Sequence, residues 1–239
     1  MTLSIFPNDN FAIWTHRGSP HPEHTALAFQ RAWDSGIRNF EVDIRKTKDH
    51  IVVLAHDSTL KRVAGVNLIV EDLTFEELQS HPIAGERWMT LQELLLQYPS
   101  ARISIDFKSD DVLDRAIEIL RKIPHSGLVL GSFSGRRTHR LRSEFPHHAS
   151  AATAIEILCL KFGILPRSIR ERKIYAMVPR RHKGITVLTK KFLKTCQGAK
   201  IPVHVWVIND RLEMLDLARH GVSGVVTDCY DRLIDHKNS

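Results

Sequence analysis

Short apolar or alternating runs recur along the chain, and stretches with helical character lie between them. Eight runs are candidate strands, at residues 12–16, 39–44, 103–107, 127–133, 148–153, 173–178, 203–208 and 223–228. Such runs, separated by helical segments, are typical of parallel strands joined by crossover helices. In 239 residues they predict an α/β fold of the (β/α)8 TIM-barrel class, although an open doubly wound sheet shows a similar alternation. No Gly-x-Gly-x-x-Gly follows any run, which argues against the nucleotide-binding form of the open sheet.

The segments between the strands carry helix signals. Residues 25–36 predict a helix that ends at a glycine, and residues 112–123 predict one that closes before a proline. Capping-box signatures stand at two further places, Thr74 with Glu77 and Thr90 with Glu93. The stretch after the second strand is too long for an ordinary loop, so we expect residues 57–89 to form a small insertion over the barrel mouth.

The size and composition of the chain predict one domain spanning residues 1–239. An apolar content of 43% is enough for one sizeable core. The three cysteines, Cys159, Cys196 and Cys229, lack metal-ligand or disulfide-framework spacing, which fits a reducing compartment. The first residues do not resemble a secretory signal, and no run reaches the roughly 18 apolar residues of a membrane helix. We therefore expect a cytoplasmic protein.

The net charge of +7 is concentrated in the middle of the chain. Residues 136–183 hold 12 Lys and Arg against 3 Asp and Glu. Such a segment can attract phosphate-bearing ligands, although most basic runs are solvated surfaces. A non-catalytic barrel that binds polyanions is therefore one alternative. The run lacks interleaved aromatic residues and nucleic-acid-binding motifs, so we expect no nucleic-acid partner.

Acidic side chains stand at the ends of the second and third candidate strands, where barrel enzymes carry their active sites. Glu41 and Asp43 are two residues apart and share one strand face, as do Asp106 and Lys108. Carboxylates that are crowded together need a cation between them, and three hard oxygen ligands suit Mg²⁺, Ca²⁺ or Mn²⁺. The alternatives are that Glu41 and Asp43 form salt bridges, or that Asp106 and Lys108 pair with each other.

Two histidines and two cations complete the candidate chemistry. His16 ends the first run, and His56 ends the run IVVLAH in the expected hairpin after the second strand. Near a divalent metal, such a pair can serve as general acid and base, while Arg17 and Lys108 can bind phosphate oxygens. A single histidine at a strand end is more often structural. The coincidence of all these residues at strand ends favours a catalytic interpretation.

These residues belong to a longer pattern that resembles the glycerophosphodiester phosphodiesterases, in their short single-domain bacterial form. The matching pieces are HRG at 16–18, PEHT at 22–25, AF at 28–29, EVDIRKTKD at 41–49, HDSTLKR at 56–62, TLQELL at 90–95, IDFK at 105–108, and the closing VWVIND and GVSGVVTD. The resemblance implies hydrolysis of glycerophosphodiesters to an alcohol and glycerol 3-phosphate.

The resemblance also implies roles for individual residues. It gives His16 and His56 as the acid–base pair, and Arg17 and Lys108 as phosphate contacts. It gives Glu41, Asp43 and Asp106 as metal ligands, and Trp206 as an aromatic pocket wall. Three positions depart from the family pattern: Asp106 stands where glutamate is usual, His24 where asparagine is usual, and Val207-Ile208 where Thr-Val is usual. These departures bear on substrate preference.

Residues 151–173 join an apolar run to a basic one. This segment could form a lid that accepts a lysolipid or touches an anionic membrane surface. That role would give a lysophospholipase D activity by the same chemistry. The simpler interpretation is a buried loop or helix.

Overall fold

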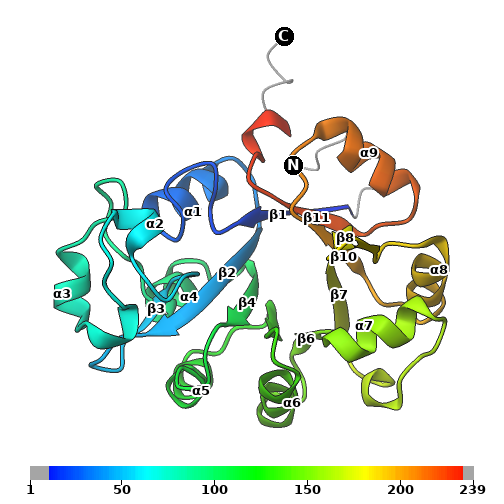
Figure 1. Ribbon diagram of the computed structural model, residues 1–239, viewed down its shortest axis with the longest axis horizontal. Helices are drawn as coiled ribbons and strands as arrows, with labels where there is room; N and C mark the ends of the chain where they lie inside the picture. The colour runs from blue at the N-terminus through cyan, green and yellow to red at the C-terminus, as the bar shows by residue number, and fades with distance from the viewer. Residues whose placement is uncertain (1–10, 234–239) are drawn as a thin grey trace.

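The computed structural model describes residues 11–233, and its centre is a closed barrel of parallel strands (Figure 1). The barrel strands are β1 (Ala12–His16), β2 (Asn39–Lys46), β4 (Arg102–Phe107), β5 (Leu128–Gly131), β6 (Ala149–Ala151), β7 (Ile174–Pro179), β10 (Val203–Trp206) and β11 (Gly224–Thr227). They follow one another around the barrel in chain order, and the parallel pairing of β1 with both β2 and β11 closes it. The predicted (β/α)8 barrel is confirmed, and each of its strands overlaps a predicted run.

Helices surround the barrel and bury its outer face. They are α1 (Ala26–Asp34), α4 (Leu91–Gln97), α5 (Leu113–Lys122), α6 (Gly135–Glu144), α7 (Ala154–Lys161), α8 (Lys190–Gly198) and α9 (Arg211–Arg219), with short 3-10 turns η2 (Arg167–Ile169) and η3 (Asp231–Leu233). The main core lies between strands and helices, where Phe29, Phe40 and Phe107 are fully buried. Inside the barrel, Trp14 packs with Val129 and Val226. None of the helices among residues 11–233 combines the length and apolar character needed to cross a membrane.

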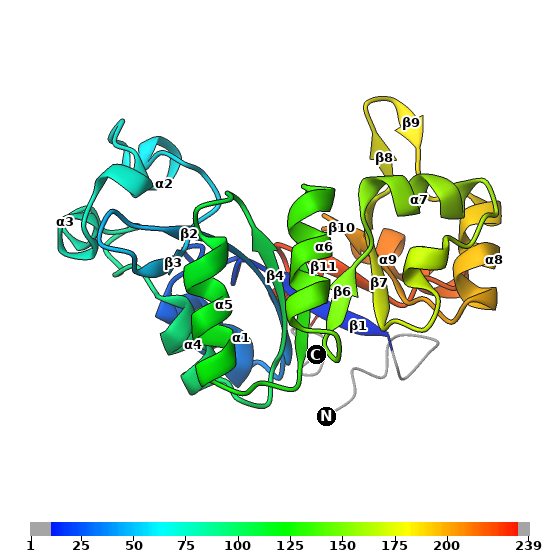
Figure 2. The ribbon, with the colours of Figure 1, turned by 90° about the horizontal axis from the view of Figure 1, so that it is seen from below.

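The insertion after the second strand is present and lies on the mouth side of the barrel (Figure 2). Strand β3 (Val52–Leu54) leads into it, and residues 57–89 contain α2 (Lys61–Ala64), η1 (Val70–Asp72) and α3 (Phe75–Gln79). Strand β3 runs antiparallel to β2, which is the expected hairpin. The insertion has an apolar cluster of its own that includes Leu60, Val70 and Trp88. Both predicted capping boxes form, at the starts of α3 and α4.

The region from residue 127 to 190 differs most from the prediction. Strands β5 and β6 are shorter than expected, and the first part of the basic segment, residues 136–144, lies in α6, which buries Leu141 and Arg142. The apolar part of the possible lid is helix α7, opened by a third capping box between Thr153 and Glu156. A small hairpin of β8 (Arg181–His182) and β9 (Ile185–Thr186) was not predicted.

A cavity of about 640 Å³ opens at the amino-terminal end of the barrel. Residues that begin strands line it, among them Arg102, Leu128, Lys173 and Ile174. It lies at the opposite end from His16, Asp43 and the other strand-end residues, so it is not part of the candidate active site.

The three cysteines are free thiols. The amino-terminal residues considered for a signal sequence lie outside the described part of the chain.

Candidate active site

A sharp turn follows β1 and holds His16 and Arg17 at the barrel mouth. Arg17 and Gly18 both adopt positive φ, at 57° and 85°. A Cβ atom on Gly18 would lie 2.6 Å from the Cβ of Ala28 on α1. This close approach, in a conformation that residues with a side chain seldom adopt, requires glycine. The turn therefore explains why the HRG motif has a glycine at position 18 and why α1 has a small residue, Ala28, facing it.

Strand register brings the predicted ligands together. Asp43 of β2 lies opposite Asp106 of β4, and Glu41 of β2 lies opposite His16 of β1. Because Glu41 and Asp43 are two residues apart, their side chains share one face of the strand. The structure thus assembles these four residues at the carboxyl ends of three neighbouring strands.

Cations already lie among these carboxylates. The Lys108 Nζ atom is 2.7 Å from Asp43 Oδ1 and 2.8 Å from Asp106 Oδ2. The Nε atom of Arg17 is 3.0 Å from Asp43 Oδ2, but neither of these two atoms makes a hydrogen bond. Burial would lower the pKa of Lys108, but Asp43 and Asp106 outweigh it and raise the pKa. The pairing of Asp106 with Lys108, one of the alternatives raised by the sequence, is therefore present.

The three carboxylates differ in their proton affinity. Burial, followed by the charges of Asp43 and Asp106, raises the pKa of Glu41 well above its ordinary value. Burial also raises the pKa of Asp106, against the opposing effect of Lys108. Burial acts in the same direction on Asp43, but His24, Lys108 and Arg17 together lower its pKa. At Glu41, the charges of the neighbouring carboxylates therefore outweigh those of the neighbouring cations, so the electrostatic potential there is negative.

This donor set fits a divalent cation in charge and in chemistry. Glu41 Oε2 and Asp43 Oδ2 are buried and have no hydrogen-bond partner. Hard oxygen ligands of this kind suit Mg²⁺, Ca²⁺ or Mn²⁺. Across residues 11–233, no three ligating side chains have the spacing of a ready-made metal site. Lys108 contacts both Asp43 and Asp106, and it would have to release at least one of them for a cation to bind between them.

Each candidate catalytic histidine is held by an aspartate through Nδ1. His16 Nδ1 is 2.7 Å from Asp228 Oδ1, and His56 Nδ1 is 2.6 Å from Asp57 Oδ1. Burial would raise the pKa of both aspartates, but hydrogen bonds outweigh this effect and lower the pKa. Asp228 accepts these hydrogen bonds from His16 and Asn209. Asp57 accepts them from His56 and Arg62. An ionised carboxylate only accepts hydrogen bonds, so it keeps a proton on Nδ1 and leaves Nε2 as the exchanging nitrogen. In His16, this Nε2 atom is 4.0 Å from Glu41 Oε2.

A chain of ion pairs connects the insertion to the site. Arg62 of α2 donates two hydrogen bonds to Glu23, each 2.7 Å, and one of 2.6 Å to Asp57 Oδ2. The other oxygen of Asp57 holds His56, while Glu23 lies 3.6 Å from Arg17. The insertion therefore positions His56 and braces the turn after β1.

His24 has a structural role in the same turn. It is buried at positive φ, 59°, and its Nε2 atom accepts a hydrogen bond from the backbone N–H of Asp43 at 3.2 Å. Burial lowers the pKa of His24 to about 4, despite the raising effect of Asp43. The imidazole that replaces the usual asparagine is therefore neutral near pH 7 and acts as a hydrogen-bond acceptor.

Aromatic side chains form one wall of the mouth. Trp206, the last residue of β10, contacts Phe133 edge-to-face with ring centroids 6.1 Å apart. The Phe133 ring also lies 5.6 Å from Lys108 Nζ. The predicted position of Trp206 beside the polar site is consistent with a pocket wall, and Phe133 extends it.

Sequence reasoning missed six of these residues as members of the site: Glu23, Asp57, Arg62, Phe133, Asn209 and Asp228. Each stands within, or next to, a strand end or family motif that had been singled out. Their positions in the sequence could have indicated them, since Asp57 directly follows His56 and Asp228 ends the last predicted strand. Asn209, which donates a hydrogen bond of 3.0 Å to Asp228, gives the same signal at the end of the seventh run.

Comparison with known proteins agrees with this geometry. The model of the glycerophosphoryl diester phosphodiesterase family matches residues 16–232. The chain belongs to this family. It is therefore an enzyme of the phosphoric diester hydrolase class, as the residue pattern predicted.

Curated relatives match this chain along most of their length. The lysophospholipase D GDPD1 of Mus musculus is 30% identical, over 94% of this chain and 85% of its own. A glycerophosphodiester phosphodiesterase of Caldanaerobacter subterraneus is 27% identical, over 93% of this chain and 96% of its own.

Solved structures share the fold. The glycerophosphodiester phosphodiesterase of Thermotoga maritima superimposes with a TM-score of 0.76 at 23% identity, covering 94% of this chain and 97% of its own. A phosphodiesterase of Oleispira antarctica, solved in complex with the product sn-glycerol-3-phosphate, superimposes with a TM-score of 0.77 at 19% identity. The alignment covers 100% of this chain and 99% of that one. At these identities the likeness establishes the barrel fold.

Proposed function

We propose that this enzyme hydrolyses glycerophosphodiesters to glycerol 3-phosphate and an alcohol, with His16 and His56 transferring protons and Glu41, Asp43 and Asp106 holding a divalent cation. One observation carries the proposal: two imidazoles, each fixed at Nδ1 by an aspartate, stand at the mouth beside a carboxylate cluster in which two buried oxygens have no hydrogen-bond partner. The family match and the product named for the Oleispira antarctica relative support the substrate class.

The two histidines have complementary tasks in this proposal. The neutral imidazole accepts a proton at Nε2 from the attacking hydroxyl or water, while the protonated one donates its Nε2 proton to the oxygen of the departing alcohol. Asp228 and Asp57 stabilise the imidazolium form of His16 and His56 and keep each ring oriented. Each proton transfer contributes about 10²- to 10⁴-fold to the rate.

The cations bind and orient the phosphodiester. Arg17 and Lys108 lie among the carboxylates, and their positive charge attracts the nonbridging phosphate oxygens. A bound divalent cation supplies further charge neutralisation and lowers the pKa of an attacking hydroxyl. If a cation took one of the carboxylates that Lys108 contacts, the ammonium group could turn toward the phosphate.

The test is the release of glycerol 3-phosphate from glycerophosphocholine by chelator-stripped enzyme, with Mg²⁺, Ca²⁺ or Mn²⁺ added back. We expect at least one cation to restore turnover to the parent enzyme and to the control Glu118→Gln, whose carboxylate pairs with Arg115 on the outer surface of α5. Glu41→Gln should stay inactive. Turnover by the stripped enzyme that no cation increases would refute the metal-dependent part.

A lysophospholipase D activity is the second candidate, favoured by the name of the 30% identical mouse relative and by the aromatic wall of Trp206 and Phe133. The same chemistry would release choline from lysophosphatidylcholine. Comparing kcat/KM for lysophosphatidylcholine and glycerophosphocholine separates the two candidates. A ratio below one assigns the deacylated substrate.

A further inference from the structure

Helix α7 carries an apolar stripe that nothing in residues 11–233 covers. Ile155, Leu158 and Phe162 are 76%, 54% and 60% exposed. Their spacing of three and four residues places them on one side of the helical turn, with Glu156 and Leu160 buried on the other. A helix that is apolar on both sides is normally buried on both. The outer side of α7 is therefore apolar, and within residues 11–233 no other element packs against it.

A cationic hairpin projects near this stripe. Lys183 and Gly184, with φ of 46° and 80°, form the two-residue turn between β8 and β9. Arg181 and Lys183 are exposed, and in the described part of the chain neither pairs with an acidic side chain. By contrast, the preceding Arg180 pairs with Glu213 of α9. The hairpin thus presents positive charge that no acidic side chain of residues 11–233 neutralises.

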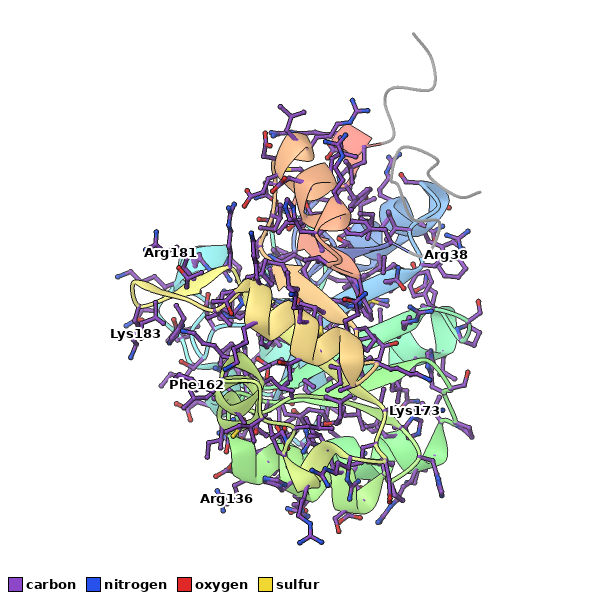
Figure 3. The ribbon with its side chains drawn as sticks, turned by 90° about the vertical axis from the view of Figure 1, so that its right-hand side faces the viewer. Arg38, Arg136, Phe162, Lys173, Arg181 and Lys183 are labelled. Carbon is purple, nitrogen blue, oxygen red and sulfur yellow. The ribbon has the colours of Figure 1, made fainter. Side chains whose placement is uncertain are left out.

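The stripe and the hairpin face the same way as the barrel mouth. The hairpin rises from the end of β7 on the side where the insertion lies, and α7 runs beneath it (Figure 2). Arg181, Lys183 and Phe162 point to this side of the molecule, whereas Lys173 points to the opposite side (Figure 3). Ile185, 60% exposed, adds an apolar side chain to the hairpin. We call Ile155, Leu158, Phe162, Arg181, Lys183 and Ile185 the mouth rim.

We propose that the mouth rim docks on the surface of an anionic phospholipid bilayer, so that the barrel mouth faces the lipid. A bilayer surface accepts apolar side chains at the headgroup boundary and attracts cations to its anionic lipids. The mouth rim offers both and contains no acid. Since it has few apolar anchors and two cations, the attachment is reversible and weakens as salt screens the charges.

Co-sedimentation of the full chain with vesicles tests the docking. We expect binding to vesicles of phosphatidylcholine mixed with phosphatidylglycerol, and much weaker binding to phosphatidylcholine alone. The double variant Arg181→Gln/Lys183→Gln should lower the partition coefficient about 30-fold at low salt, because each cation near an anionic surface contributes a factor of about five. The double variant Ile155→Ser/Phe162→Ser should lower it about tenfold or more.

Two control variants match these changes outside the mouth rim. Leu96→Ser removes an exposed apolar side chain from α4, and Lys173→Gln removes a cation from the opposite side of the molecule. Both should bind vesicles like the parent protein. All variants should hydrolyse water-soluble glycerophosphocholine at the parent rate, which separates docking from catalysis. Vesicle binding needs no turnover, so failure of the proposed reaction would leave this result intact.

Several outcomes would overturn the proposal. One is equal binding of the mouth-rim variants and the parent protein. Another is a dimer in light scattering that Phe162→Ser dissociates while vesicles bind nothing, which would assign the stripe to a second copy of the chain. A third is salt-sensitive retention on DNA without vesicle binding, which would assign the hairpin to a nucleic acid.

Discussion

At the scale of single residues, His16 and His56 share one arrangement although they come from different elements. Each imidazole gives its Nδ1 to an aspartate and presents Nε2 at the mouth. The tautomer matters as well as the position of the ring, because an imidazole that carries its proton on Nε2 has no lone pair there to accept another proton. Asp228 is therefore a positioning residue for His16.

Replacing Asp228 with asparagine tests this role. The amide of Asp228→Asn can donate to Nδ1 and so place the imidazole proton on Nε2, which removes the lone pair that Nε2 of His16 needs for proton transfer. We expect kcat for glycerophosphocholine to fall about 10²- to 10⁴-fold with little change in KM or Tm. Asp216→Asn, on the exposed surface of α9, is the control and should keep the parent kcat. A loss of stability that accounts for the loss of activity would contradict the assignment.

His24 lends itself to a stability measurement. Its Nε2 atom is the acceptor for the buried N–H of Asp43. His24→Ala leaves that N–H unpaired, whereas His24→Gln places an amide oxygen at a similar reach. Urea denaturation should therefore give a free energy of unfolding about 1–3 kcal/mol lower for the alanine variant than for the glutamine variant. Equal values for the two variants would mean that the hydrogen bond adds nothing to stability.

At the scale of elements, α7 is anchored by a buried ion pair that faces away from its exposed stripe. Arg142 of α6 donates hydrogen bonds of 2.7 and 2.8 Å to the two oxygens of Glu156, and Thr153 N–H and Ser168 Oγ donate to the same carboxylate. Burial would raise the pKa of Glu156, but these hydrogen bonds outweigh it and lower the pKa to about 2. The pair fixes the start of α7 against α6 and leaves its other side exposed.

Acid should weaken this anchor. Because the pKa of Glu156 falls from an ordinary 4.5 to about 2 on folding, its contribution is complete above pH 4.5 and is lost as the pH falls toward 2. The difference corresponds to about 3 kcal/mol. Urea denaturation of Glu156→Gln at pH 7 should show a loss of about 3–5 kcal/mol, since Arg142 stays buried without a counter-charge. Its stability should also depend less on pH between 4.5 and 2 than that of the parent.

Glu144→Gln provides the matched control for this pair. Its carboxylate pairs with Arg121, whose side chain is largely exposed. An exposed pair of this kind contributes less than about 1 kcal/mol, so the control should unfold like the parent. A loss as small as this in Glu156→Gln would show that the buried pair is not the anchor of α7.

At the scale of the whole molecule, the pairing of β2 with β4 places Asp43 beside Asp106, and within residues 11–233 Glu41 forms no ion pair with a lysine or arginine. A divalent cation that binds only the folded protein should stabilise it. At a cation concentration of 100 times its Kd the gain is about 2.7 kcal/mol, which corresponds to a rise in Tm of about 5–10 °C. Differential scanning calorimetry with and without cation measures the shift. It should vanish in Glu41→Gln and persist in Glu118→Gln; a shift that survives in Glu41→Gln would place the cation elsewhere.

The local pattern of residues was sufficient to predict the barrel strands, the hairpin of β2 and β3, and the capping boxes of α3 and α4. These features depend on the period of apolar residues and on contacts between near neighbours, which a single sequence displays. The same pattern did not predict the β8–β9 hairpin, because each of its strands is two residues long and exposed, and so has no apolar alternation. It also overextended β5, because Phe133 continues the apolar run but turns out to the mouth.

The sequence by itself determined the barrel class, the family and the residues that stand at strand ends, since period, motif order and strand position are local properties. Only the tertiary structure decided which of those residues meet. Strand register set Asp43 opposite Asp106, and the Lys108 side chain came to lie between them. Barrel closure brought Asp228 to His16 across 212 residues of chain. Distances between side chains so far apart in sequence depend on the packing of the whole barrel, which no local pattern contains.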